Sequence, residues 1–267
     1  MQISTITAAL ETWAPLSYQE SYDNAGLIIG DPLANCTGIL CSLDCTEAVV
    51  DEAIAQGCNL IVSHHPIVFK GIKQFTPNHY VTRVAVKAIK NNIALYAIHT
   101  NLDNIIDGVN KTLADKLRLE NRSILAPLPG IFDKNGNPVG AGLVGELPLE
   151  TDEQDFIKWV KEKFNLAVVK HTPFINKQLK TIALCGGAGS FLIDAVKRKN
   201  IDCFITSDLK YHEFFEADGQ LLLLDIGHGE SEQFVPALIV AYLTGKFPTF
   251  AVLESSVNTQ PVRYLKD

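Results

Sequence analysis

Short runs of apolar residues alternate along the chain with stretches in which apolar residues recur every three or four positions. The short runs predict strands at 38–44, 59–65, 93–100, 141–150, 167–172, 181–187, 202–208, 221–228 and 249–255. The periodic stretches predict helices at 6–14, 46–57, 80–92, 107–119, 152–164, 191–200, 211–217 and 230–245. Because strands and helices alternate with short connections, we expect an α/β protein whose mostly parallel or mixed sheets are covered by helices, in three layers.

The alternation lapses between residues 121 and 138, where Pro, Gly and Asn accumulate. Such a composition predicts a loop or a hairpin, and it is the best internal boundary that the pattern offers. We therefore expect two α/β subdomains, residues 1–124 and 125–267, with the C-terminal units able to return to the first sheet.

The composition narrows the class of protein. Of 267 residues, 47% are hydrophobic and 20% charged, as in ordinary globular proteins. The net charge of −7 argues against nucleic-acid binding by phosphate neutralisation. No apolar run reaches the roughly 20 residues that span a membrane, and the N-terminus does not resemble a signal peptide, so we expect a cytoplasmic protein.

The six cysteines form no CxxC pair, and most fall in strand-like segments. Buried, reduced thiols are the favoured interpretation. A zinc site at Cys36, Cys41 and Cys45 is a weak alternative, because the spacing is loose.

Polar residues that could do chemistry follow three of the predicted strands. Ligands of open α/β sheets bind at the carboxyl ends of the strands, so these positions are informative. They are His64 and His65 before Pro66, His99 with Asp103 four residues later, and His228 with Glu232 four residues later.

The spacing of these residues suits a pair of metal ions. Neighbouring imidazoles at a strand end can address two cations about 3.5–4 Å apart. A spacing of four residues places His228 and Glu232 on one helical face, and a carboxylate can bridge two cations. Histidines and carboxylates together fit Zn, Mn, Fe or Ni better than Ca. Taken singly, each histidine is more often structural, and Asp103 or Glu232 could serve a helix start; taken together they indicate a metal site.

Other segments carry weaker signals. The segment "CGGAGS" at 185–190 could cradle an anion or form a simple tight turn. After another strand, Asp208 and His212 could begin a helix or could orient ligands and carry protons. The segment 20–31, with Asp23 and Asn24, is interpreted as a turn.

The segments "ESYDNAGLIIGD", "SHHP", "HTNLD", "TSDLKYHEF" and "GHGESE" together resemble, in order and spacing, the Nif-three-like family. Its members are also known as dinuclear metal-centre proteins and as GTP cyclohydrolase 1 type 2 homologues. The resemblance covers about residues 20–260. It implies two α/β subdomains and a ring-shaped homohexamer with the metal sites facing an inner cavity. It also implies that the inserted domain of longer members is missing here.

The resemblance maps the metal ligands of the family onto residues that the spacing had already selected. They are His64, His65, Asp103, His228 and Glu232, with Glu232 expected to bridge. His99 is not among the family's ligands, so we assign it, with His212, to orienting ligands or to proton transfer. Tyr22 and Gly229 depart from residues common in the family, and neither removes an expected ligand.

These observations lead to two hypotheses about function. The first is a metal-dependent hydrolase in which a water activated by two divalent ions attacks a nucleotide or a phosphoester. The second is a non-catalytic metal-binding scaffold or regulatory interaction protein. No guanine-reading motif supports GTP as the substrate, and a DNA-binding ring is disfavoured by the net charge.

Overall fold

The computed structural model describes residues 1–265, in which the chain divides into two compact units. The first unit comprises Met1–Leu102 and Phe234–Pro261. The second comprises Asp103–Gln233 and the described residues from Val262 onward. The first segment of the first unit thus ends at Leu102, before the predicted boundary near residue 124, and the chain returns to the first unit at Phe234.

Five strands form the mixed sheet of the first unit, in the order β1–β4–β3–β2–β11. They are β1 (Gly26–Ile29), β2 (Ile39–Ser42), β3 (Leu60–Ser63), β4 (Ala94–Ala97) and β11 (Val252–Glu254). Only β1 is antiparallel to its neighbour among these described strands. The strand β11 pairs in parallel with β2, so the C-terminal segment adds to the first sheet as the sequence allowed.

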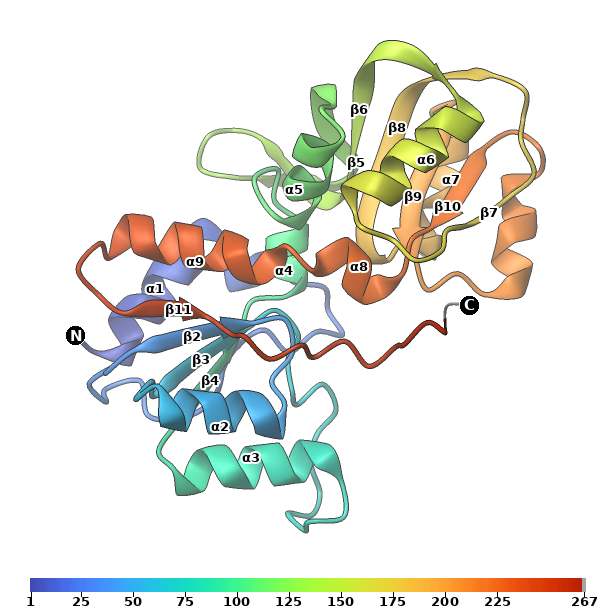
Figure 1. The fold of residues 1–267 in the computed structure, drawn as a ribbon. Helices are drawn as coiled ribbons and strands as arrows, with labels where there is room; N and C mark the ends of the chain where they lie inside the picture. Colours follow the sequence, from blue (N-terminus) through green and yellow to red (C-terminus); the bar gives the residue numbers. More distant parts are fainter. Residues whose placement is uncertain (266–267) are drawn as a thin grey trace. The chain divides into compact units, whose positions relative to one another are not determined.

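Helices cover both faces of this first sheet (Figure 1). Helices α2 (Glu47–Ala55) and α3 (Tyr80–Lys90) lie on one face, and α1 (Ile3–Trp13) and α9 (Val235–Lys246) lie on the other. The predicted cap of α2 is present, because Thr46 accepts a hydrogen bond from the amide of Val49. Trp13 and Tyr242 stack with their ring centroids 4.3 Å apart and join α1 to α9. The short helices η1 (Leu16–Tyr18) and α4 (Thr100–Asp103) complete the first part of the chain.

Six strands form the mixed sheet of the second unit, in the order β5–β6–β8–β9–β10–β7. They are β5 (Glu120–Phe132), β6 (Pro138–Asp152), β7 (Lys170–His171), β8 (Gln178–Ala188), β9 (Cys203–Ser207) and β10 (Leu222–Asp225). The strands β8, β9 and β10 are parallel, and the others pair antiparallel with their neighbours. The segment 121–138 is therefore most of the first strand and the turn of a long hairpin, one of the two structures that the sequence predicted, and it lies inside this unit rather than at its boundary.

Helices also cover the sheet of the second unit (Figure 1). Its helices are α5 (Val109–Lys116), α6 (Glu153–Lys163), η2 (Ser190–Leu192), α7 (Ile193–Arg198), η3 (Tyr211–Ala217) and α8 (His228–Glu232). Asp152 caps α6 by accepting from the amides of Gln154 and Asp155. The single helix expected at 230–245 is divided into α8 and α9, because Pro236 lacks the amide that a continuous helix would need there.

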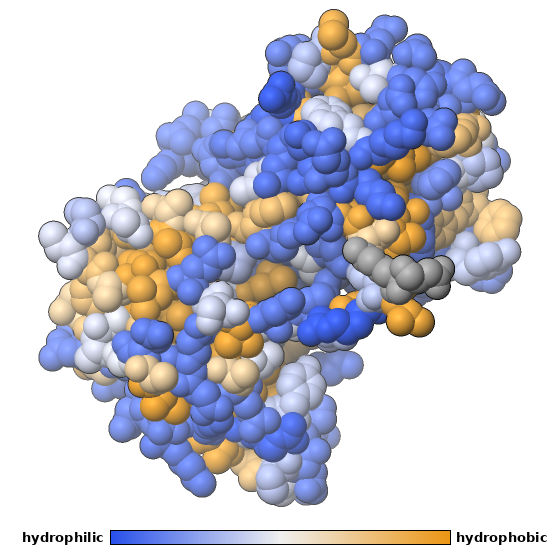
Figure 2. Space-filling view, in the orientation of Figure 1, coloured by the Kyte–Doolittle hydropathy of each residue, from blue (hydrophilic) through white to orange (hydrophobic). Residues whose placement is uncertain are grey.

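The described surface is mainly hydrophilic over the outward faces of α3 and α6, with scattered hydrophobic residues (Figure 2). The apolar faces of both sheets are buried beneath the helices. Among the described residues, no helix is long and apolar enough to span a membrane. The α/β prediction with helix-covered sheets is confirmed.

Candidate functional site

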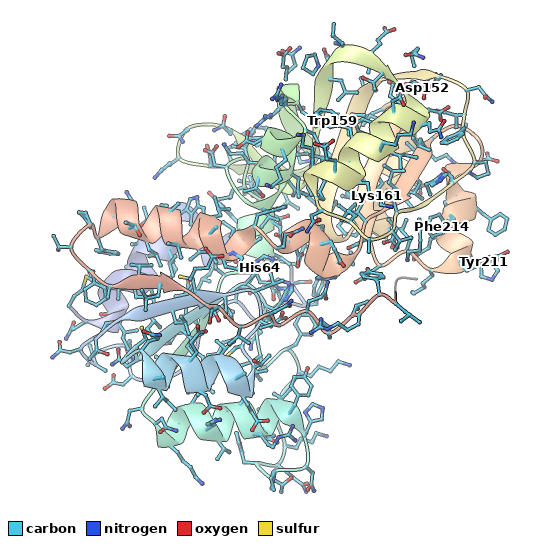
Figure 3. The ribbon with its side chains drawn as sticks, viewed as in Figure 1. His64, Asp152, Trp159, Lys161, Tyr211 and Phe214 are labelled. Atoms are coloured by element: carbon cyan, nitrogen blue, oxygen red, sulfur yellow. The ribbon has the colours of Figure 1, made fainter. Side chains whose placement is uncertain are left out.

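Three histidines gather at the carboxyl ends of β3 and β4 in the first unit. These strands are parallel neighbours in which Ser63 lies opposite Ala97, so the residues that follow them converge. The ring centroids of His64 and His65 are 4.9 Å apart, and His99 lies 5.3 Å from the first and 5.4 Å from the second. One possible ligand atom of each lies within 4.8 Å of the others, a separation that a single cation can bridge. His64, labelled in Figure 3, is fully buried.

The imidazoles of His64 and His65 are held by their Nδ1 atoms. The Nδ1 of His64 lies 2.8 Å from the carbonyl oxygen of Ile98, and the Nδ1 of His65 lies 2.8 Å from a carboxylate oxygen of Asp44. Carbonyl and carboxylate oxygens only accept, so Nδ1 carries the proton and donates. In the neutral ring this tautomer leaves the lone pair on Nε2, the atom that a ligating histidine of this kind presents to a metal ion.

His99 has the same arrangement, with Asp23 as its acceptor. Its Nδ1 donates to Asp23 over 2.7 Å, and the same carboxylate accepts from the amide and the hydroxyl of Thr100. Burial raises the pKa of Asp23, but the hydrogen bond and charge of His99 and the Thr100 hydroxyl outweigh it and lower the pKa to about 2. Asp23 therefore stays ionised and fixes the ring of His99.

Asp23 and Asp44 were not recognised as site residues in the sequence. The sequence predicts a turn within 20–31, and the chain does turn at residues 21–22 before it enters β1, whose antiparallel partner β4 leads to His99. Asp44 lies two residues beyond β2, as His65 lies two residues beyond β3, and a carboxylate at this third strand end is the signal in the sequence that identifies it.

The second unit brings His228, Glu232 and Asp208 together. Asp208 follows β9 and His228 follows β10, and these strands are parallel neighbours. The Nδ1 of His228 donates to Asp208 over 2.7 Å, while its Nε2 lies 3.1 Å from a carboxylate oxygen of Glu232. The spacing of four residues on α8 thus places His228 and Glu232 on one face, as the sequence indicated. Glu232 is buried, with its side chain 3% exposed.

The glycine-rich segment at the end of β8 packs against Glu232. The amide of Gly187 donates to the hydroxyl of Ser231 over 2.9 Å, and the amide of Gly186 donates to the side chain of Asn110 over 2.9 Å. A Cβ atom at position 187 would lie 2.5 Å from Glu232 Oε1, and the φ angle there is +64°. These amides serve the local structure, and the segment is the irregular end of strand β8 rather than the anion cradle or tight turn that the sequence offered; its glycines leave room for the glutamate.

Asp103 ends α4 and begins the second unit. Its backbone carbonyl accepts a hydrogen bond from the side chain of Asn110 over 3.2 Å. Burial raises the pKa of the Cys185 thiol well above its usual range, and the negative charges of Asp103 and Glu232 raise it further. The two carboxylates therefore share one electrostatic environment with Cys185.

Two weaker predictions have different outcomes. His212 lies exposed on η3, with its ring 5.2 Å from that of Tyr211 and 6.2 Å from that of Phe215; Figure 3 labels Tyr211 on this helix. Its assignment to proton transfer stays a prediction. The six cysteines are buried and form no disulfide, as expected, and burial raises the pKa of Cys36 to about 11 and that of Cys45 to about 12. A thiol held protonated in this way is a poor zinc ligand.

The donor groups fit a divalent transition metal. The first unit offers imidazole Nε2 atoms whose rings are already oriented, and the second offers an imidazole and two carboxylates. Imidazole and carboxylate ligands suit Zn, Mn, Fe and Ni. Each ring is fixed by a hydrogen bond at Nδ1, which is the outer arrangement that metal-binding histidines need.

A family model described as Duf34/NIF3 (NGG1p interacting factor 3) matches residues 1–261. A GTP cyclohydrolase 1 type 2 homolog of Clostridium acetobutylicum is 33% identical over 244 residues, covering 90% of this chain and 88% of the relative. A relative of the same name from Staphylococcus epidermidis is 29% identical over 366 positions, covering 99% of this chain and 100% of the relative. That relative therefore carries residues without a counterpart here.

Solved structures agree with this likeness. The crystal structure of a Staphylococcus aureus hypothetical protein matches with a TM-score of 0.89 at 31% identity, covering 99% of each chain. A Bacillus cereus protein related to NIF3 matches with a TM-score of 0.92 at 23% identity, again covering 99% of each chain, which shows the same fold. The resemblance seen in the sequence is confirmed, and the chain belongs to the Duf34/NIF3 (NGG1p interacting factor 3) family.

Proposed function

We propose that this chain is a dinuclear metal-binding hydrolase that acts on a nucleotide or phosphoester. The proposed ligands of the two divalent ions are His64, His65, Asp103, His228 and Glu232. The observation that carries the proposal is the common orientation of the imidazoles: His64, His65 and His228 each have Nδ1 at an oxygen acceptor. Fixing three side chains in this way costs conformational entropy, and binding of metal ions by their Nε2 atoms would offset that loss.

Bound divalent ions would lower the pKa of a water and neutralise charge on the scissile group. The protein's own part is to hold the ions and to orient the side chains around them. Glu232 offers two carboxylate oxygens in a buried position, which suits a bridge between two ions. His99 is a proposed proton carrier, and its ring is held in place because its Nδ1–H donates to the ionised Asp23. His212 remains a second proposed proton carrier.

The names of the relatives and the donor groups of the site both bear on the class of substrate. The relatives are named GTP cyclohydrolase 1 type 2 homologs, which favours a nucleotide. A phosphoester without a base is equally compatible with the donor set. An inactive metal-binding scaffold or regulatory interaction protein is the second candidate, and the family description, which names an interacting factor, favours it.

The test is a substrate panel on protein reconstituted separately with Mn, Zn, Fe and Ni. Wild type is compared with His65→Ala, with Glu232→Ala and with the double variant that carries both changes. His171→Ala serves as a control, because His171 is an exposed residue of the edge strand β7 whose Nδ1 donates to the carbonyl oxygen of Thr172. We expect metal content and hydrolysis to fall in the first two variants and to persist in the control. Hydrolysis at the wild-type rate in both His65→Ala and Glu232→Ala would refute the proposed metal-dependent hydrolase activity. Metal retained at wild-type stoichiometry in the double variant would refute the site, and bound metal without turnover on any substrate would favour the scaffold.

We further propose that the chain forms a ring-shaped homohexamer in the cytoplasm. The family resemblance supports the hexamer, and the six buried cysteines without disulfides support a reducing compartment. Light scattering coupled to gel filtration should give six times the chain mass, and a monomer or dimer at micromolar concentration would contradict the assembly.

A further inference from the structure

The first unit contains a pocket of about 630 Å³ that has His65 in its wall. This volume lies within the range of about 300–1,000 Å³ that is typical of small-molecule sites, and it exceeds what a phosphate ion alone would need. We name it the His65 pocket. It is formed by the segments 44–46, 65–67 and 69–72, by the first turn of α3, and by Thr259 and Pro261.

One part of the His65 pocket is apolar and aromatic. Phe69 and Tyr80 line it together with Ile67 and Ile72. The two aromatic residues are unusually open, with Phe69 45% and Tyr80 57% exposed. An exposed aromatic ring beside a pocket can be covered by a planar ligand ring, because stacking buries both faces and is favourable for any nucleobase.

Another part of the pocket favours an anion. Lys70 lines it, and no ion pair of Lys70 is found within residues 1–265. The Nδ1 of His79 accepts from the amide of Val81 over 3.3 Å, so the neutral ring carries its proton on Nε2 and can donate it. The first turn of α3 contains no acidic residue, and the positive end of its dipole faces the same lining.

The one carboxylate in the lining is already engaged. Asp44 accepts from His65 Nδ1 through one oxygen over 2.8 Å and from the hydroxyl of Thr259 through the other over 2.7 Å. Its charge is thus directed at these donors, and Lys70 and His79 are left to meet a ligand.

We infer that the His65 pocket binds a phosphomonoester whose organic part contains a planar aromatic ring, such as the base of a nucleoside monophosphate. The ring stacks on Tyr80 and Phe69, Lys70 balances the phosphate charge, and His79 donates a hydrogen bond to the phosphate from Nε2. Because His65 is also a proposed metal ligand, this inference rests on the proposed function and names the substrate class of that site. His65 belongs to the same lining as Lys70 and His79, so a ligand in the pocket would share it with a proposed metal ligand.

The test is equilibrium binding to metal-free protein, measured by calorimetry and by saturation-transfer NMR. The probes are adenosine 5′-monophosphate, phenyl phosphate, adenosine and inorganic phosphate. Lys70→Met and Tyr80→Ala are compared with Lys73→Met and Ile89→Ala. Lys73 is an exposed lysine of the same loop outside the lining, and Ile89 is a 53% exposed residue of the same helix. Circular dichroism checks that all four variants fold.

We expect adenosine 5′-monophosphate and phenyl phosphate to bind more tightly than adenosine or inorganic phosphate. Loss of the Lys70 charge or of the Tyr80 ring should each weaken binding of the nucleotide about 10-fold, with wild-type affinity in both controls. No saturable binding of either phosphomonoester to wild type would overturn the inference. An affinity for adenosine equal to that for adenosine 5′-monophosphate would also overturn it. The same holds if the phosphomonoesters bind only after metal loading, with an affinity that is unchanged in Lys70→Met and Tyr80→Ala. Failure of the metal centre alone leaves binding to the metal-free protein intact, so the two proposals fail separately.

Discussion

Replacing Asp44 by asparagine removes the negative charge that faces His65 while keeping an acceptor of nearly the same size. In the wild type, His65 Nδ1 lies 2.8 Å from one carboxylate oxygen, and Thr259 donates to the other. The asparagine oxygen can still accept from Nδ1–H, so the ring keeps its tautomer. What the variant loses is the electrostatic support that makes Nε2 a stronger donor to a metal ion.

The size of the effect follows from the geometry. Loss of a group that supports a metal-bound histidine typically lowers metal affinity by about 10–100-fold. Asp44 is 34% exposed at its side chain, so water screens part of its charge, and asparagine retains one neutral hydrogen bond. We therefore expect the low end, an affinity about 10-fold weaker, which corresponds to about 1.4 kcal/mol.

Metal affinity is measured by competition between the metal-free protein and a chromophoric chelator, with Mn²⁺ and Zn²⁺ in turn. Asp51→Asn is the matched control, because Asp51 is an exposed carboxylate of α2 that pairs with Lys87. A thermal unfolding midpoint close to that of wild type in both variants would separate an effect on the site from one on the fold. Wild-type affinity in Asp44→Asn, or an equal loss in Asp51→Asn, would refute the assigned role of Asp44.

Three further outcomes follow from the structure. Gly187→Ala should lower metal affinity at least as much as Asp44→Asn, because the new Cβ atom would lie 2.5 Å from Glu232 Oε1. Gly219→Ala is the control: its backbone has a similar positive φ (+66°), but its Cβ atom would have no neighbour within 4 Å, so this variant should bind metal like the wild type. The pKa of Asp202 is lowered, since backbone and lysine hydrogen bonds outweigh the effect of its burial. The contribution of Asp202 to stability is therefore present above its unfolded pKa near 3.8 and is lost as the pH falls through the lower folded pKa. In urea unfolding, Asp202→Asn should lower the free energy of unfolding by about 2–3 kcal/mol at neutral pH and by less near pH 3. An equal loss at both pH values would contradict this reasoning. Phe156→Ala, at a fully buried position, should cost about 3–5 kcal/mol of unfolding free energy in the same assay, and a loss below 1 kcal/mol would contradict its place in the core.

The local pattern of the sequence was sufficient for features that depend on near neighbours. Alternating apolar runs and helical periods predicted the α/β class, and Thr46 marked the start of α2. The spacing of four residues predicted that His228 and Glu232 share a helical face. Such features follow from the repeat of a strand or a helix, which any short window of sequence contains.

Only the tertiary structure decided which carboxylates hold the imidazoles. Asp44 is 21 residues from His65, Asp23 is 76 residues from His99, and Asp208 is 20 residues from His228 along the chain. These pairs depend on which strands become neighbours in the sheet.

The boundary between the two units also depends on which strands become neighbours. The pairing of β11 with β2 returns the C-terminal segment to the first sheet, and the hairpin of β5 and β6 places residues 121–138 inside the second unit. Periodicity indicates which face of a strand is buried, but the order of strands is settled by the packing of the whole chain.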